Sequence, residues 1–399
     1  MKPVFTTQRL RVLVEHLTVE IVNEPDRFQK LEDEWTDLFN RCPHVTPYQS
    51  FCWNMASWKA DGGKDVPAIC TVREGGRLVG IAPFTCNRKL GVNVLEPIGS
   101  RDYAYFGLII ERQRSDVSQI IAQCLVSHYR TGVIHVPYHT SSQQDVISML
   151  YALSTRGWAS ATWVRNVSHF LEYQGGYADY LASKSSKARY NLKRERRVLE
   201  DVGPINLELY AGPKVTAEIL QRVALLQQRS RLSRYGQPLL TERRLMDVVL
   251  PMSQEGLSEI YLLTVGSQDV AYMWNYTAHG KNFCNMIGFD NNWERFSPGK
   301  VMAGLVLERL LARGDQHFDF LFGESPYKRF WMNRTHQVVR SVAWRGCRGW
   351  VLSVFPNRLH GFVTRHDRLR QAARAARDLW NRRPGKPEQR PNNQDSEAK

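Results

Sequence analysis

Apolar and polar positions along this chain alternate between helical and strand periods, and the order of the resulting segments occurs twice. In the first half, helical spacing of apolar residues predicts helices at 26–40, 115–129 and 142–154, and an aromatic-rich turn and helix at 46–58. Short apolar segments between turn residues predict strands at 67–73, 77–86, 92–98, 105–110, 133–136 and 158–164. In the second half, the same criteria predict helices at 177–202, 216–232 and 298–313, and strands at 259–265, 270–277, 282–289, 317–322, 337–344 and 350–355.

The repeated order predicts an α+β protein built from two copies of one unit, each a mostly antiparallel twisted sheet flanked by helices. We place the two domains at residues 1–170 and 171–354. Residues 355–383 combine many arginines with apolar positions at helical spacing, which predicts a basic amphipathic helix. The polar residues 384–399 predict a disordered tail.

The helix near residue 300 has the clearest start and stop signals in the chain. Ser297 is a good N-cap, Pro298 suits the first helical position, and Gly314 follows the last turn. The unpaired backbone N–H groups of such a start attract anions, Gly299 leaves room for a ligand, and Lys300 adds charge. A phosphate or pyrophosphate site is one interpretation of this start, and an ordinary capped helix packed on a sheet is the other.

The apolar strand after this helix carries a single carboxylate. Period-2 alternation places Phe318, Phe320 and Phe322 on one side and Asp319 on the other. The corresponding helix of the first half is preceded by residues 111–116, which lack the Ser-Pro-Gly sequence. If this element binds a cofactor, only the second copy is therefore expected to do so.

Composition and charge narrow the function classes. Apolar runs are shorter than the roughly 20 residues that a membrane-spanning helix needs, and arginines interrupt the N-terminus where a secretory signal would be apolar. The seven cysteines are scattered without a Cys-x-x-Cys pair, which indicates free thiols in a reducing, cytoplasmic setting and no metal site. The net charge of +15 favours an anionic partner. The basic segment 355–383 could lie on an anionic membrane at its inner face, or pack on its own domain.

Several motifs together resemble GNAT-type acetyltransferases of the CelD-like branch, which is named after a protein of bacterial cellulose synthesis and is similar to the FemAB group. The motifs are Phe296–Gly299, His317–Phe320, Tyr327–Lys328, Thr46–Phe51, Gly80–Pro83 and Ser183–Arg194. The resemblance implies two GNAT-like folds in tandem, of which the first binds no cofactor. It also implies acetyl-CoA or another acyl-CoA as donor, and a sugar or a nucleotide- or lipid-linked glycan precursor as acceptor. The chain departs from the branch at Gln227–Ser230, where relatives tend to carry His and Trp.

The resemblance also assigns roles to individual residues. Contacts with the pantetheine and pyrophosphate of acyl-CoA fall to Met286, Gly288, Phe289, Ser297, Pro298, Gly299 and Lys300. Tyr327 would protonate the leaving thiolate, and Asp319 would act as base or orient Lys328. Lys328 would hold the acceptor or the carbonyl oxygen, and Glu324 and His279 are weaker base candidates. Each of these residues also has an ordinary packing or surface explanation.

A helix between the halves is rich in cations. Arg189, Lys193, Arg196 and Arg197 fall at helical spacing on one side, where they could grip the diphosphate of a nucleotide- or lipid-linked substrate. A charge-rich solvated helix is the alternative explanation.

Three functions therefore compete. The first is an acyl-CoA-dependent N- or O-acyltransferase, in particular an acetyltransferase, that modifies a sugar, polysaccharide or cell-envelope precursor by direct acyl transfer. The second is a FemAB-like aminoacyl transferase using charged tRNA, and the third is a non-catalytic accessory subunit of exopolysaccharide synthesis. Sequence-specific binding of nucleic acid is not expected, because no groove-reading motif is present.

Overall fold

The computed structural model describes residues 16–100, 105–130, 132–230 and 245–354. The basic helix expected at 355–383 and the tail at 384–399 lie outside these ranges. Among the described helices, none combines the length and the apolar character that crossing a bilayer requires.

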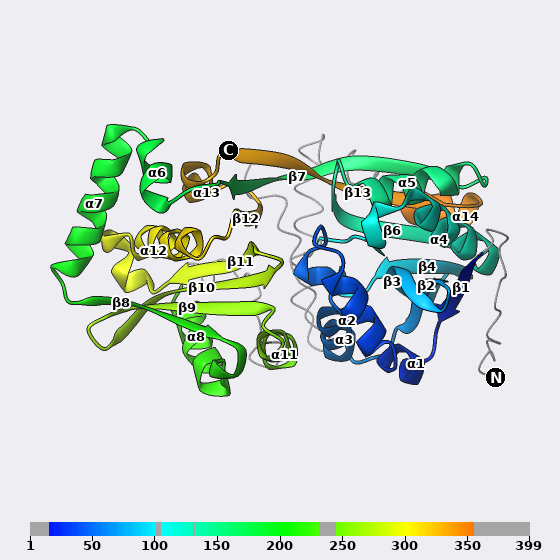
Figure 1. Ribbon diagram of the computed structural model, residues 1–399, viewed down its shortest axis with the longest axis horizontal. Coiled ribbons are helices and arrows are strands. Elements are labelled where there is room, and N and C mark those ends of the chain that lie inside the picture. Colours follow the sequence, from blue (N-terminus) through cyan, green and yellow to red (C-terminus); the bar gives the residue numbers. More distant parts are fainter. Residues whose placement is uncertain (1–15, 101–104, 131, 231–244, 355–399) are drawn as a thin grey trace, which may run out of the picture.

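One sheet runs through the described part of the molecule and connects both halves (Figure 1). It has 13 strands in the order β1-β2-β3-β4-β6-β13-β7-β12-β11-β10-β9-β8, with β5 paired to β3. The strands of the first half are β1 (Leu17–Val22), β2 (Val66–Glu74), β3 (Arg77–Lys89), β4 (Val92–Pro97), β5 (Ile109–Ile110), β6 (Gly132–Thr140) and β7 (Ala159–Glu172). Those of the second half are β8 (Ile205–Ala211), β9 (Ser258–Val265), β10 (Gln268–Ala278), β11 (Lys281–Phe289), β12 (His317–Phe322) and β13 (Arg334–Trp344).

Strand β7 joins the halves. It pairs with β13 along its length and with β12 near its end, through residues 168–172. Strand β13 falls in the range assigned to the second domain, yet it pairs with β6 and β7 in the sheet of the first half. A strand of the second half therefore lies in the sheet of the first, and the two halves share one hydrogen-bonded sheet.

Helices cover both faces of the sheet in each half. In the first half, α4 (Ser115–His128) and α5 (Gln144–Ser154) cover one face, and α1 (Pro25–Gln29), α2 (Glu32–Asn40) and α3 (Phe51–Ala60) cover the other. In the second half, α6 (Tyr177–Ala182), α7 (Ser186–Glu200) and α12 (Pro298–Ala312) lie on one face, and α8 (Ala217–Arg229) and α11 (Leu250–Gln254) on the other. This arrangement confirms the α+β class and the large twisted sheet flanked by helices.

One apolar cluster belongs to both halves. Tyr48, Trp53 and Tyr105 from the first half pack with Trp274 and Tyr276 from the second. Rings of this size bury much apolar surface and favour edge-to-face contacts, which stabilise the junction. The junction between the halves is therefore a packed aromatic cluster.

Four expected elements differ in the structure. The helix at 26–40 is divided into α1 and α2, and the helix at 177–202 is divided into α6 and α7, where Ser185 accepts the N–H of Ala188 as a new N-cap. Only Ile109–Ile110 of the strand expected at 105–110 is extended as a paired strand. The strand expected at 350–355 is wrong, because Cys347–Ser353 forms the helix α14, whose Trp350 and Val351 are exposed.

A buried histidine between β6 and β13 makes the stability of this sheet sensitive to acid. The imidazole of His139 contacts the Thr140 carbonyl at 3.0 Å and Ser341 Oγ at 2.9 Å. Burial lowers the pKa of His139 to about 4. Because the unfolded chain then binds the proton more readily than the native state, this stability is present above the unfolded pKa of about 6.5 and is lost as pH falls toward 4.

We predict that the free energy of unfolding falls between pH 6.5 and 4.5 by an extra ~1 kcal/mol per pH unit owing to His139. The His139→Gln variant should lack this part of the slope, whereas a change at the exposed His16, His16→Gln, should keep it. Urea unfolding at a series of pH values measures both slopes. Equal slopes for the wild type and His139→Gln would contradict the assignment.

Candidate active site

The parallel pairing of β11 and β12 stops after three residue pairs. The last pair joins Phe283 to Asp319, and beyond it β11 continues to Phe289 along β10 while β12 ends at Phe322. The two strands therefore diverge toward the start of α12 (Figure 1). Backbone groups of both strands beyond this pair have no partners in each other, so the opening can hydrogen-bond a ligand.

The start of α12 is built differently from the expected cap. Ser297 occupies the N-cap position as expected, but its φ is 54° and its side chain makes no cap hydrogen bond. Pro298 begins the helix as expected, and the Ser297 carbonyl accepts the N–H groups of Lys300 and Val301. Gly299 packs on Phe289, whose ring would lie 3.1 Å from an added Cβ.

Lys300 is committed to another helix. Its ammonium donates to the carboxylate of Glu195 on α7 at 2.8–2.9 Å and lies 4.8 Å from the centroid of the Phe330 ring. This ion pair fixes α7 beside the start of α12. A phosphate at this corner would be held mainly by backbone groups, with Lys300 contributing at longer range.

Two residues of β11 expected at the cofactor have packing partners. The Sδ of Met286 accepts a hydrogen bond from Gln227 Nε2 at 3.1 Å. Gly288 lies directly against the ring of Tyr272, which would be 2.5 Å from an added Cβ. The absence of a side chain at Gly288 is therefore explained by close packing on β10, whatever else this strand binds.

A buried carboxylate lies where β11 and β12 part. Asp319 is 1% exposed and accepts hydrogen bonds from Ser168 Oγ at 2.6 Å, from the Leu321 N–H at 2.7 Å and from the Tyr105 hydroxyl at 3.0 Å. Three donors compensate the loss of water around a charged group. The Tyr105 oxygen lies 2.9 Å from Nε2 of His336. Residues from β7, β12, β13 and the loop before β5 thus form one connected network.

The protonation states in this network follow from its geometry. Since Tyr105 gives its proton to Asp319, its oxygen can only accept the Nε2–H of His336. Burial lowers the pKa of His336, partly opposed by the negative Asp319, so the imidazole is neutral at pH 7 with Nδ1 free to accept a proton. Burial, with the nearby Asp319, raises the pKa of Tyr105 well above 10, which keeps its hydroxyl protonated.

A bulge in β12 changes the orientation of its last side chain. Leu321 has φ 57°, and the pairing with β7 shifts between Asp319 and Phe322. Phe322 therefore packs against Tyr105, with ring centroids 5.0 Å apart, on the face that carries Asp319. The prediction that Phe322 shares a side with Phe318 and Phe320 is wrong, although Asp319 does point away from those two rings.

Lys328 binds the backbone at this bulge. Its ammonium donates to the Phe322 carbonyl at 2.5 Å and to the Leu321 carbonyl at 3.4 Å. Both carbonyls lie at the bulge, where the pairing of β12 with β7 shifts between Asp319 and Phe322. Lys328 consequently places positive charge beside the point where the strands diverge.

The other two expected catalytic residues lie on different sides of the network. Tyr327, on α13 (Pro326–Trp331), packs edge-on to Phe320 at 6.0 Å, on the α12 side of the sheet. Burial raises the pKa of Tyr327, so it is protonated. Glu324 is half-exposed on the loop before α13, where it lies 3.2 Å from Nε2 of His169 and 3.6 Å from Nε of Arg329.

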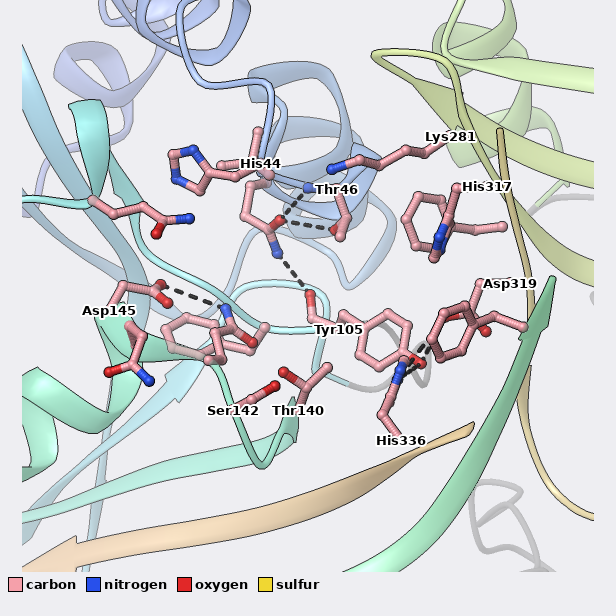
Figure 2. A pocket seen from close by; sticks show the side chains of 18 of the residues that line it. His44, Thr46, Tyr105, Thr140, Ser142, Asp145, Lys281, His317, Asp319 and His336 are labelled. Carbon is pink, nitrogen blue, oxygen red and sulfur yellow. Dashed lines mark hydrogen bonds and ion pairs between the residues drawn. The ribbon is translucent and has the colours of Figure 1, made fainter. Parts of the chain in front are cut away.

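A pocket of about 470 Å³ opens beside Asp319, between the two halves (Figure 2). Tyr105, Asp319 and His336 lie at one end of it, and Asp145 and Ser142 lie at the other. Most of its polar lining is neutral: Thr46, Gln49, Gln113, Thr140, Ser142, Gln143 and Gln144. Aromatic faces are contributed by Tyr105, Phe106, Phe170 and Phe283.

The basic helix α7 lies away from this pocket. Arg189 donates to the Ala182 and Lys184 carbonyls, and Arg196 pairs with Glu200 and Glu308. Lys193 and Arg197 are exposed. None of the four cations expected to bind substrate is among the residues that line the pocket, and α7 instead packs on α12.

Sequence reasoning missed Tyr105, Ser168 and His336. Their partners lie 151 to 231 residues away in the chain, so spacing gave no signal. A weak one was available, because His336 precedes an apolar strand and Tyr105 opens a short segment that was read as a strand. His279, the weaker base candidate, instead packs on Phe39, with ring centroids 5.0 Å apart.

Comparisons with known proteins agree with this architecture. Residues 186–329 match the family described as acetyltransferase (GNAT) domain. Among solved structures, FemX is similar over 81% of this chain and 98% of its own, with 10% identity and a TM-score of 0.62. The C-terminal domain of an Agrobacterium fabrum protein described as a lysylphosphatidylglycerol synthetase is similar over 82% and 95%, with 9% identity and a TM-score of 0.52.

A conserved protein of unknown function from Bacteroides thetaiotaomicron is similar over 82% of this chain and 99% of its own, with 10% identity and a TM-score of 0.50. No curated protein sequence matches the chain. Identities this low show a shared fold and nothing finer. The GNAT-like fold is confirmed, and the match of residues 186–329 in the second half supports an acyltransferase.

We predict that Gly288→Ala destabilises the protein by about 1–3 kcal/mol, because the new methyl group meets the Tyr272 ring. Gly176→Ala is the matched control, since a Cβ there meets only Asp179 at 3.5 Å. Denaturant unfolding measures both. A Gly288→Ala protein that keeps its stability would show that the ring can move, and that the glycine serves a ligand instead.

Proposed function

We propose that this protein transfers an acyl group, most simply acetyl, from acyl-CoA directly to an amine or hydroxyl of a sugar or a nucleotide- or lipid-linked glycan precursor. The observation that carries the proposal is that β11 and β12 part beside a buried network whose His336 can accept a proton. The network opens on the pocket between the halves, where an acceptor would bind. The setting we propose is the cytoplasm, at or near the inner face of the membrane, within synthesis of an exopolysaccharide or of the cell envelope.

The donor site is supported by the fit of the diverging strands. GNAT domains use acyl-CoA, whose pantetheine arm offers amide groups that can pair with open strand backbone. The end of β11 from Met286 to Phe289 and the start of α12 from Ser297 to Lys300 are contiguous along one edge of this opening. Acyl-CoA supplies the activated thioester, and these residues would hold it.

His336 is the residue best placed to take the proton of the acceptor. It is neutral at pH 7 and half-buried, and it lines the pocket. Asp319 acts through Tyr105: its negative charge orients the phenol, and the phenol oxygen fixes the tautomer of His336. In this proposal Asp319 is a positioning residue. The sequence had offered it as the base itself or as a group that orients Lys328.

Tyr327 and Lys328 would serve the leaving group and the carbonyl region. Tyr327 is protonated and lies on the α12 side of the sheet, so it can give a proton to a thiolate emerging on that side. Lys328 stabilises negative charge near the same opening through its position on the Phe322 carbonyl. The base His336 and the acid Tyr327 would then lie on opposite faces of the sheet.

A sugar acceptor is supported by the pocket lining. Neutral amide and hydroxyl side chains bind sugar hydroxyls, and aromatic faces stack on the apolar side of a sugar ring. The two cations that line the pocket are engaged already, since Lys281 donates to the Pro43 carbonyl at 2.9 Å and Arg334 pairs with Glu172 at 2.5 Å. The lining thus favours a polyhydroxyl group over a strongly charged one.

The similarity to FemX supports a second candidate, an aminoacyl transferase that draws on charged tRNA. Exposed cations on α7, among them Lys193 and Arg197, could contact a nucleic-acid backbone. An acyl-CoA enzyme should gain thermal stability from acetyl-CoA, by about 2.7 kcal/mol at 100 times the dissociation constant. Stabilisation by aminoacyl-tRNA with no response to acetyl-CoA would replace the first proposal by the second.

We predict that cells lacking this protein lose one acyl mass from a cell-envelope or exported glycan, because the proposed reaction attaches that group. Mass spectrometry of glycans from deletion and complemented cells measures the change. Complementation by the wild type should restore the mass, and complementation by His336→Gln should not. A full glycan inventory without any acyl difference would exclude a glycan acceptor.

We predict that His336→Gln lowers kcat for acyl transfer by about 10²–10⁴-fold, since one proton acceptor is removed. The wild-type rate should fall only at a pH below the ordinary histidine range, because burial lowers the pKa of His336 and keeps the imidazole neutral through that range. The variant should lack this acidic limb. His128→Gln, on α4 and away from the pocket, should behave as the wild type, and an unchanged limb in His336→Gln would assign the base to another group.

A further inference from the structure

Tyr48 occupies the centre of the aromatic cluster that joins the two halves. It lies in the single turn η1 (Pro47–Gln49), within the Thr46–Phe51 motif that the proposed reaction leaves without a role. Its ring meets Trp53 at 5.1 Å, Tyr276 at 5.7 Å and Phe283 at 5.9 Å, in each case edge to face. Three rings from both halves therefore fix its direction.

The hydroxyl of Tyr48 is buried without a hydrogen-bond partner among the described residues. The residue is 4% exposed, and its oxygen is shielded from solvent. A buried unpaired hydroxyl destabilises a protein by about 1–3 kcal/mol, and phenylalanine would pack there at no such cost. A tyrosine at this position indicates a hydrogen bond that forms when something else is bound.

The ring of Tyr48 lies beside the opening between β11 and β12. Phe283, which contacts the Tyr48 ring, belongs to the last residue pair before the strands part. Burial is the main cause that raises the pKa of Tyr48 well above 10, and the nearby Asp319 and Cys284 raise it further. The raised pKa keeps the phenol protonated.

Tyr105 cannot supply the same hydrogen bond. Its only proton is given to Asp319, and its oxygen accepts from His336. Tyr48, at 6.4 Å between ring centroids, stands next to it with its own proton uncommitted. The two neighbouring phenols thus differ. Tyr105 uses its hydroxyl within the network, whereas the hydroxyl of Tyr48 can still donate a hydrogen bond.

We propose that Tyr48 is a catalytic hydrogen-bond donor to the acyl carbonyl oxygen of the donor thioester. This inference rests on the proposed acyl transfer and adds to it the group that binds the oxygen on which charge develops. The acceptor nitrogen or oxygen forms the bond to the acyl carbon, its proton passes to His336, and the carbon–sulfur bond breaks with its electron pair leaving on sulfur. Tyr48 keeps its proton throughout and stabilises the carbonyl oxygen by donation.

The experiment compares the full-length wild type with Tyr48→Phe and with Tyr129→Phe, a control at a buried tyrosine of the first-half core. Three quantities are measured: the melting temperature without ligand, the infrared band of the carbonyl in bound acetyl-CoA labelled with ¹³C at that carbon, and steady-state turnover. A hydrogen bond lowers the stretching frequency of a carbonyl, so the band reports the contact without relying on activity.

In Tyr48→Phe we expect the melting temperature to hold or rise, the wild-type shift of the carbonyl band to disappear, and kcat to fall about 10²–10³-fold with little change in KM. Tyr129→Phe should keep the band shift and the turnover of the wild type. A lower melting temperature of Tyr48→Phe with an unchanged band would overturn the inference, because it would show a structural role. An unchanged kcat together with an unchanged band would overturn it equally.

The outcome separates this inference from the proposed function. If labelled acetyl-CoA neither binds to nor stabilises the wild type, acyl-CoA-dependent transfer fails, and the role of Tyr48 fails with it. If the wild type binds and consumes acetyl-CoA while Tyr48→Phe matches it in band and kcat, only the role of Tyr48 fails.

Discussion

The structure around the site depends on one buried carboxylate. Asp319 lies where β11 and β12 separate, and it accepts hydrogen bonds from a β7 side chain, from the bulge of its own strand and from Tyr105 of the first half. A charge in this position is stable only while all three donors are present. The same interaction therefore holds the bulge, the junction of the halves and the orientation of the proton acceptor.

The shared sheet explains how such a network can be kept rigid. Strand β7 pairs with β13 and β12, so Ser168 on β7 and His336 on β13 are fixed by main-chain hydrogen bonds on the same frame as Asp319. Sites built on strands hold their geometry better than sites built on loops. Strand β13 comes from the second half but lies in the sheet of the first. This position brings His336 into a pocket that residues 44–49 and 105–108 also line.

The sequence allowed much of the frame to be predicted and little of the network. Apolar patterns bounded by turn residues identified the meander β9–β11, the helix α12 and the strand β12, because such patterns are local in the sequence. The contacts of Tyr105 and His336 with the second half depend on strand order, which no local pattern encodes. The orientation of Phe322 was missed for a similar reason. It depends on the bulge at Leu321, where the backbone N–H donates to Asp319, and alternation along the strand does not predict this bulge.

The first half then has a role that the comparison of repeats did not anticipate. The sequence predicts only that it is a copy without a cofactor. In the structure it provides Tyr105 to the network and much of the pocket lining. Its Gln49 Nε2 donates to the Tyr105 carbonyl at 2.8 Å, which fixes the loop that carries Tyr105. Hydrogen-bonding and aromatic side chains of the first half thus line the pocket together with residues of the second half. If the proposed transfer takes place beside Asp319, side chains of the first half that line the pocket would take part in the choice of acceptor.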